Sequence, residues 1–270
     1  MSELFLKAAP RVRAPLNQQL APLVYVVMIF AAQAAARSGA PAYGVIAQCL
    51  ILVMLLAQAA FDADDKIRRL CLALALVPLV GILNAGLTLG AFDPFVETLI
   101  VEATWLAGAV VAARYLALGR EQLGLSLGDE PDSMLACVPL TVAGPVLGLA
   151  GYVLLQPSPA LDLLAYPLWA ALPLAALALF VGFVEIVILY GVLLPACRPV
   201  LGDWAGAAYV AWLLCLLRLG PLTWQYGSLT FFEGLLLGWL VLKMRNIYGA
   251  GLAHGLALLS FFAASAMLGR

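Results

Sequence analysis

Two ionisable residues, Glu185 and His254, lie inside apolar runs of this chain and are the first candidates for chemistry. Glu185 stands between Leu-Phe-Val-Gly-Phe-Val and Ile-Val-Ile-Leu, and His254 is the only histidine. Ionisable groups at membrane depth are energetically costly, and they are retained where they function or where a partner neutralises them. A buried carboxylate can act as a general base, and an imidazole can donate a hydrogen bond to a developing negative charge. We therefore expect these two residues to converge at one site.

The composition indicates a polytopic helical membrane protein. Of the 270 residues, 65% are hydrophobic and only 11% are charged. A soluble domain of this size could not cover so much apolar surface. The net charge of −1 argues neither for nor against a nucleic-acid partner, and no basic patch is large enough to suggest one, so none is expected. We therefore expect an integral, multi-pass protein whose main partner is the lipid bilayer.

Hydropathy divides the chain into nine apolar segments. They lie at about 20–36, 42–61, 70–91, 95–117, 134–155, 163–197, 204–218, 229–244 and 248–268. We predict an all-α fold, a transmembrane bundle of about nine spans. The sixth segment is too long for one upright helix and contains Pro167, Pro173 and Gly182, so we expect a kink or break there.

Basic residues predict the orientation of these spans. All but three of the 14 lysines and arginines fall in segments that would be cytoplasmic if the N-terminus lies inside. The exceptions are Arg37, Arg218 and Arg270. We read the first apolar segment as a transmembrane helix, with a cleaved signal peptide as the alternative. The expected location is the cytoplasmic (inner) membrane.

The most polar internal stretch divides the chain into two parts. We predict four N-terminal helices over 1–118, a cytoplasmic amphipathic loop over 119–133 and a membrane core over 134–270. Three leucines of the loop are expected to face lipid: Leu123, Leu125 and Leu127.

Three stretches of the C-terminal half carry a recognisable pattern. The first begins at Glu185 and reads Glu-Ile-Val-Ile-Leu-Tyr-Gly-Val-Leu-Leu-Pro. The second is Phe-Glu-Gly-Leu-Leu-Leu-Gly over 232–238, and the third is Asn-Ile-Tyr-Gly-Ala-Gly-Leu-Ala-His, ending at His254. Over roughly 120–265 the chain resembles the CPBP family of intramembrane proteases, which includes the type II CAAX prenyl proteases and the Abi and bacteriocin-processing proteins. The resemblance implies a CAAX-protease-like core and an endopeptidase that acts on membrane-anchored protein or peptide tails.

The family motifs are only partly retained. They read Glu-Glu-x-x-x-Arg followed by Gly and Pro, then Phe-x-x-x-His, then His-x-x-x-Asn or Asp. Aligned on Gly191 and Pro195, the first glutamate is Glu185, and His254 is the histidine of the third motif. The replaced positions hold Ile186 for the second glutamate, Tyr190 for the arginine, Leu214 for the phenylalanine, Arg218 for the second-motif histidine and Leu258 for the asparagine.

These replacements weaken the chemistry that the resemblance implies. In the family, the leading glutamate and the second-motif histidine activate a water, and the last histidine and the asparagine hold the oxyanion. Arg218 cannot accept a proton, and Leu258 cannot donate a hydrogen bond. We predict a weakened or inactive homologue, a pseudoprotease or scaffold. The alternatives are an active glutamic endopeptidase that uses Glu185 as base and His254 as oxyanion helper, and a small-solute transporter.

The loss of a glutamate and the gain of an arginine suggest an ion pair. We hypothesise that Glu185 pairs with Arg218 across the sixth and seventh spans, with Glu233 as the rival partner for Arg218. A metal site is not expected, because zinc needs three protein ligands and the third would be Cys215, beside the cationic Arg218. No other cofactor is expected.

Two further features of the apolar segments bear on the site. Glu97 and Glu102 are five residues apart, about 140° around a helix, so they do not form a carboxylate pair. Glu102 is the deeper of the two and could line a polar cavity. Gly234 and Gly238 are expected to serve helix packing.

Overall fold

The computed structural model describes residues 16–37, 41–87, 93–126, 138–155, 168–218 and 224–268. The described elements are α1 (Leu16–Arg37), α2 (Pro41–Phe61), α3 (Asp65–Leu74), α4 (Leu76–Leu87), α5 (Pro94–Tyr115), α7 (Val138–Leu155), α8 (Leu168–Ile186), the π-helix η1 (Val187–Leu193), α9 (Leu194–Leu201), α10 (Asp203–Leu217), α11 (Trp224–Met244) and α12 (Tyr248–Leu268). Within these residues there is no β-strand. The all-α prediction is confirmed.

The helices match the nine apolar segments of the sequence. Six are long and apolar enough to cross a membrane, and three shorter apolar helices accompany them. α3 and α4 together form one of the six, and α8, η1 and α9 together form another. The short interruption between α3 and α4 falls at Ala75, three residues before Pro78. Proline has no N–H to donate and crowds the preceding helical turn, which accounts for the interruption.

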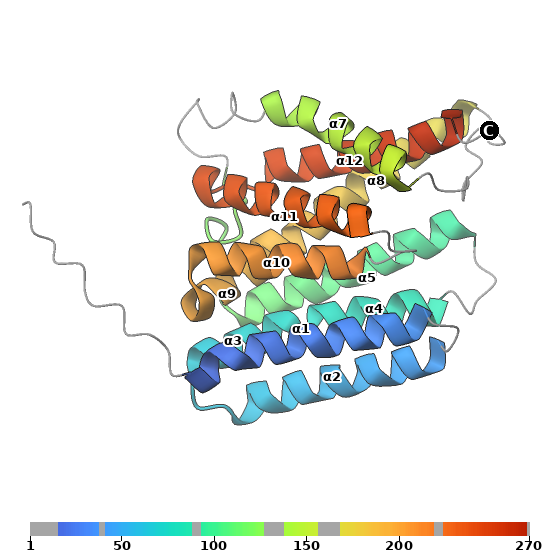
Figure 1. Ribbon diagram of the computed structural model, residues 1–270. Helices are drawn as coiled ribbons and strands as arrows, with labels where there is room; N and C mark the ends of the chain where they lie inside the picture. The colour runs from blue at the N-terminus through green and yellow to red at the C-terminus, as the bar shows by residue number, and fades with distance from the viewer. Residues whose placement is uncertain are drawn as a thin grey trace, which may run out of the picture.

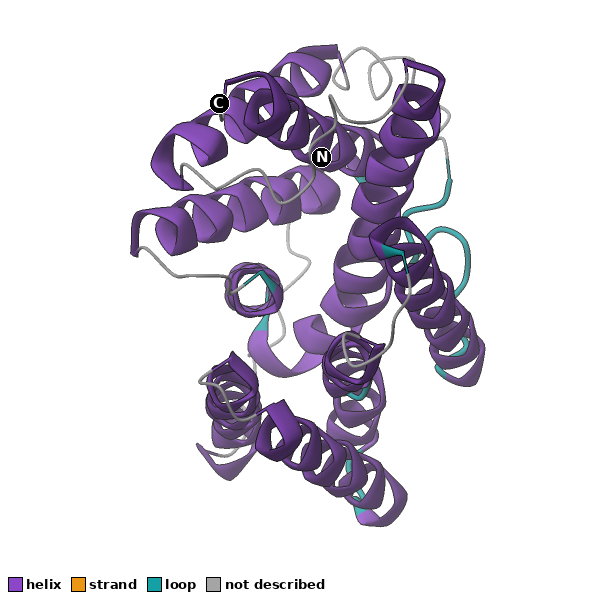
Figure 2. Cartoon of the chain, turned by 90° about the vertical axis from the view of Figure 1, so that its right-hand side faces the viewer, coloured by secondary structure: helices purple, strands orange, loops and turns teal. Residues whose placement is uncertain are grey.

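The helices lie side by side as one bundle. In Figure 1, α1 and α2 form one side, α7 and α12 form the opposite side, and α5, α10 and α11 lie between them. Figure 2, turned by 90°, shows purple helices joined by teal loops and no orange strand. The α10–α11 hairpin stops short of the end that α5, α8 and α12 reach (Figure 1).

Small residues bring α12 into close contact with its two neighbours. A Cβ added to Gly144 of α7 would collide with the carbonyl oxygen of Ala253, and one added to Gly148 would collide with that of Ala257. On the other side of α12, a Cβ on Gly182 of α8 would collide with the backbone of α12. Small residues at such crossings let two backbones approach closely, as is common between membrane helices.

The described part of the sixth segment is helical throughout, with a change of helix type and no break. Pro173 and Gly182 both lie inside a continuous α8, and Pro167 falls outside the described residues. The irregularity is η1, which follows Glu185 closely. At its end, the N–H of Leu194 bonds to the carbonyl of Leu189, five residues back. The next residue, Pro195, has no N–H to offer and needs more room than an α-turn gives, so the wider π turn accommodates it without a break.

The loop after α5 also differs from expectation. Leu123 and Leu125 are partly buried and pack against the protein core, so their predicted lipid contact is wrong. Gly124 explains the difference, because its carbonyl accepts a hydrogen bond from the N–H of Ile247 at 3.0 Å and draws the loop onto the α11–α12 junction. Leu127 lies outside the described residues. The proposed division at 119–133 remains a prediction.

Candidate functional site

Glu185 lies in the last turn of α8, directly before the π-helix. Its side chain is 13% exposed and points among the C-terminal helices. π-helical turns occur frequently at functional sites, because they change the direction of side chains on either side of them. The turn after Glu185 therefore sets where its carboxylate points relative to α10 and α12.

Arg218 caps the C-terminal end of α10. The helix has 15 residues and is therefore about 22 Å long, shorter than the hydrocarbon core of a bilayer at about 30 Å. At its C-terminal end the guanidinium is only 16% exposed. A cation at this end is favoured by the unpaired carbonyls and the helix dipole.

One carboxylate oxygen of Glu185 contacts both Arg218 and His254. Arg218 Nη2 donates to Glu185 Oε2 at 2.5 Å, and His254 Nε2 lies 2.7 Å from the same oxygen. Arg218 Nη2 also lies 3.0 Å from His254 Nε2, so the three atoms form a triangle. The hypothesised ion pair between Glu185 and Arg218 is therefore confirmed as a contact.

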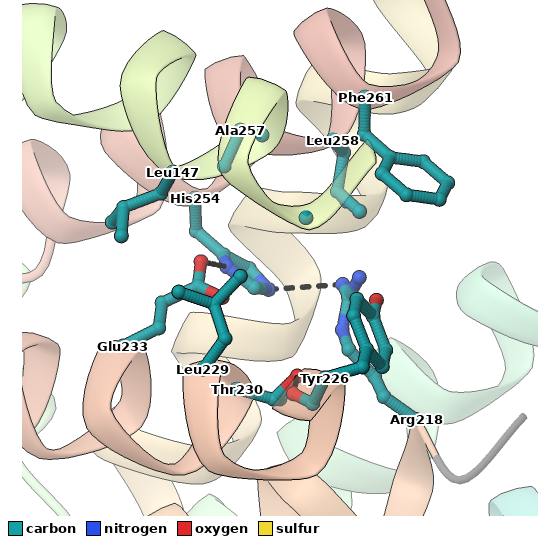
Figure 3. A pocket seen from close by; sticks show the side chains of 12 residues that line it. Leu147, Arg218, Tyr226, Leu229, Thr230, Glu233, His254, Ala257, Leu258 and Phe261 are labelled. Carbon is teal, nitrogen blue, oxygen red and sulfur yellow. Dashed lines mark hydrogen bonds and ion pairs between the residues drawn. The ribbon is translucent and has the colours of Figure 1, made fainter. Parts of the chain in front are cut away.

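Glu233 of α11 completes the cluster from the opposite side of the imidazole. Its Oε1 lies 2.7 Å from His254 Nδ1, and the imidazole is 1% exposed. In Figure 3, His254 lies between Glu233 and Arg218, each joined to it by a dashed line. The sequence suggested Glu233 as a rival partner for Arg218. In the structure Glu233 bonds to His254 instead and orients its ring.

A proton on each ring nitrogen of His254 accounts for both of its carboxylate contacts. A protonated ring would donate to both carboxylates, and the cluster of two glutamates, Arg218 and His254 would then be neutral. A neutral ring with its proton on Nδ1 would donate to Glu233 and accept from Arg218, but it would leave His254 Nε2 and Glu185 Oε2, 2.7 Å apart, with no proton between them. In either case, both ring nitrogens are already engaged by protein groups. We call Glu185, Arg218, Glu233 and His254 the charged centre.

The replaced motif positions have mostly structural environments. Ile186 and Leu214 are completely buried in the core. Tyr190 is also buried, and its hydroxyl donates to the carbonyl of Gly234 at 2.7 Å. Leu258 lies beside the charged centre on α12 and lines its cavity. The catalytic roles assigned to Glu185 and His254 remain predictions.

Gly234 and Gly238 hold α11 against η1 and α10. A Cβ on Gly234 would lie 2.9 Å from the Cα of Ala211, and one on Gly238 would lie 3.0 Å from Cε1 of Tyr190. These distances are tighter than ordinary van der Waals contact, so the two glycines form a packing face.

The cavity at the charged centre is small. It has a volume of about 30 Å³ and lies between α7, α11 and α12, with Arg218 at its edge (Figure 3). A water molecule needs roughly 10–15 Å³ of such volume, whereas pockets for drug-sized ligands measure about 300–1,000 Å³. The cavity therefore admits water but not a peptide in this conformation.

Glu102 of α5 brings a third carboxyl to the neighbourhood. Its side chain is 7% exposed and interacts electrostatically with Glu185, Arg218 and His254. One of its oxygens, Oε2, has no hydrogen-bond partner among the described residues. The sequence identified Glu102 as a deep acidic residue but could not relate α5 to α8.

The charged centre does not have the form of a metal site. Across the described ranges, no group of three or more histidine, cysteine or acidic side chains is arranged to hold a metal ion. Both nitrogens of His254 face carboxylates, and the Arg218 guanidinium lies against that of Glu185. This set of donors does not suit a divalent cation, which a guanidinium would repel.

The family follows from a direct sequence comparison. Residues 167–259 match the family model described as type II CAAX prenyl endopeptidase Rce1-like. This segment is the smaller part of the chain, and its match supports membership of the CAAX protease family. The match and the six apolar helices together support a CAAX-type intramembrane protease homologue that is an integral membrane protein. The matched segment includes the whole charged centre and excludes Glu102. No curated protein and no solved structure matches the chain.

Proposed function

We propose that this chain is a non-proteolytic member of the CAAX-type protease family, in which the former catalytic centre is an ion-pair lock. The supporting observation is that Glu185 Oε2 is shared by Arg218 at 2.5 Å and His254 at 2.7 Å. A general base must have a lone pair within reach of the water that it activates. Here one of the two carboxylate oxygens, Oε2, is held by a guanidinium and an imidazole, which reduces the availability of Glu185 as a base.

The replaced residues support the same proposal. The family resemblance places a histidine at Arg218, but a guanidinium stays charged and accepts no proton. It also places an asparagine at Leu258, whose side chain offers no donor to an oxyanion. The loss of one oxyanion donor typically lowers kcat by about 100- to 1,000-fold. The loss of the water-orienting histidine would reduce the rate further.

The proposed role is to hold a membrane-anchored protein or peptide, the class of molecule that the family name implies as substrate. The charged centre would then serve as a rigid core that joins α8, α10, α11 and α12. Since its cavity admits only water, a partner that entered there would have to separate α7 from α11. We further propose that the protein resides in the cytoplasmic membrane with its N-terminus inside, in keeping with its basic residues.

Removal of the Glu185 carboxylate tests the proposed ion-pair lock, the pairing of Glu185 with Arg218 and His254. In Glu185→Ala, Arg218 loses its carboxylate within a buried site, and the loss of one partner of a buried pair costs up to about 3–5 kcal/mol. We expect a large fall in the thermal midpoint of the purified protein and in its abundance in membranes. Arg218→Leu in the same chain should restore part of that loss, because no unpaired guanidinium remains.

The exposed Glu121→Ala is the matched control and should leave stability unchanged. Failure of Arg218→Leu to improve the stability of Glu185→Ala would contradict the lock.

One observation favours a second candidate, an active endopeptidase. Glu233 fixes His254 through Nδ1, as a carboxylate orients the histidine of a hydrolytic triad. This candidate requires Glu185→Gln and His254→Ala to abolish cleavage of a membrane-anchored reporter while both proteins still accumulate. The ion-pair lock instead predicts that the wild-type protein cleaves no reporter above the level of these two variants.

A further inference from the structure

Two buried atoms of opposite charge type lack a hydrogen-bond partner near the charged centre. They are Oε2 of Glu102 and Nε of Arg218. The other buried side-chain atoms without a partner in the described part of the chain are amide atoms of Gln48 and Asn246. A buried polar group without a partner is costly, and more so when it carries charge. One of these atoms is an acceptor and the other a donor, so the two side chains are suited to pair with each other.

The position of Glu102 places it within the influence of Arg218. α5 packs against α8, which carries Glu185, and against η1, which follows it. Arg218, Glu185 and His254 all act electrostatically on the Glu102 carboxyl. The side chain is 7% exposed, so water screens these interactions little.

We propose that Glu102 is a second carboxylate partner for Arg218, so that the guanidinium can pair with Glu185 or with Glu102. The inference rests on the proposed ion-pair lock. A guanidinium carries five N–H donors in a planar fork, and Nη2 alone is used on Glu185 and His254. Reorientation of both long side chains would bring the unused Nε side of the fork to Glu102.

The second partner extends the lock beyond the family segment. Glu102 lies in the N-terminal part of the chain, outside 167–259. Pairing with Arg218 would fasten α5 to the end of α10, and it would keep the guanidinium satisfied whenever Glu185 is neutralised or displaced. Glu102 is thus a positioning residue, because it acts through Arg218.

A set of isosteric variants tests this alternative pairing. Glu185→Gln is made in the wild-type chain and in Glu102→Gln, and the thermal midpoint of each purified protein is measured in detergent. We expect Glu185→Gln to lower the midpoint by about 2–4 °C more when Glu102 is already replaced. Glu102→Asp, which keeps the charge, should remove part of that extra loss.

Two controls identify Arg218 as the group that couples the two glutamates. In an Arg218→Leu background, the extra loss should disappear, because no guanidinium remains to be shared. Glu97→Gln, on the same helix, should not change the effect of Glu185→Gln. If the double variant does not accumulate, addition of Arg218→Leu should restore its accumulation.

Additive losses in the wild-type background, or an extra loss that persists in Arg218→Leu, would overturn the proposal. This outcome is separable from failure of the lock itself. The lock fails if Arg218→Leu does not improve Glu185→Ala, whereas the second pairing fails if that improvement occurs and the Glu102 effect is additive.

Discussion

Gly182 of α8 and Gly255 of α12 lie back to back where the two helices cross. A Cβ on Gly182 would collide with the Cα and N of Gly255, and one on Gly255 would lie 2.9 Å from the Cα of Leu179. Glu185 follows Gly182 by one helical turn, and His254 precedes Gly255 directly. The close crossing therefore permits the 2.7 Å contact between the carboxylate and the imidazole.

Gly182→Ala should separate the two helices and weaken the charged centre. The added methyl meets backbone atoms that cannot move aside, and overpacking of this kind typically costs about 1–3 kcal/mol. We expect a lower thermal midpoint in detergent. Gly86→Ala is the control, because a Cβ there meets nothing within 4 Å. An unchanged thermal midpoint for Gly182→Ala would contradict this prediction, because the crossing would then accommodate a methyl group.

The contact between Glu233 and His254 predicts a graded response to substitution. Glu233→Gln keeps an oxygen that can accept from Nδ1 of His254, so only the charge is lost. Glu233→Leu removes the acceptor and leaves a buried ring nitrogen unpaired, which typically costs about 1–3 kcal/mol. Thermal unfolding should therefore rank wild type above Glu233→Gln and Glu233→Gln above Glu233→Leu. Equal midpoints for the two variants would contradict the hydrogen bond.

Much of the architecture follows from hydropathy and charge. The lengths of the apolar segments alone predict nine spans. In lipid, an isolated segment can pair all of its backbone N–H and C=O groups only as a helix. The pairing of Glu185 with Arg218 also follows, because one intramembrane carboxylate and one intramembrane guanidinium would each be costly alone. The family motifs supplied the register that places the two residues on neighbouring helices.

The features that sequence reasoning missed depend on geometry across helices. The contact of Glu233 with His254 depends on the rotation of α11 against α12, which hydropathy does not encode. The π-helix has a local signal in Pro195, but proline equally predicts a kink, and the choice depends on packing around Tyr190. The inward packing of Leu123 depends on a backbone hydrogen bond between Gly124 and Ile247, far apart in sequence.

Tyr190→Phe should test the fastening of η1 to α11. The hydroxyl donates to the Gly234 carbonyl at 2.7 Å in a buried site, and the net value of such a bond is about 0.5–1.5 kcal/mol. We expect a moderate loss of thermal stability. Tyr248→Phe removes an exposed hydroxyl that donates to Leu125 at 3.2 Å, and it should have less effect. A greater loss of thermal stability in Tyr248→Phe than in Tyr190→Phe would contradict the assignment of the Tyr190–Gly234 hydrogen bond as the more important contact.

The proposed orientation can be tested by labelling single cysteines. Arg37→Cys and Glu121→Cys are made separately in a variant without the five native cysteines. The predicted topology places the Arg37→Cys thiol outside and the Glu121→Cys thiol in the cytoplasm. A membrane-impermeant maleimide added to intact cells should label Arg37→Cys at once. Glu121→Cys should react only after the membrane is permeabilised, because its loop would be cytoplasmic. The reverse pattern would place the N-terminus outside, and the excess of basic residues would then lie on the face that the positive-inside rule disfavours.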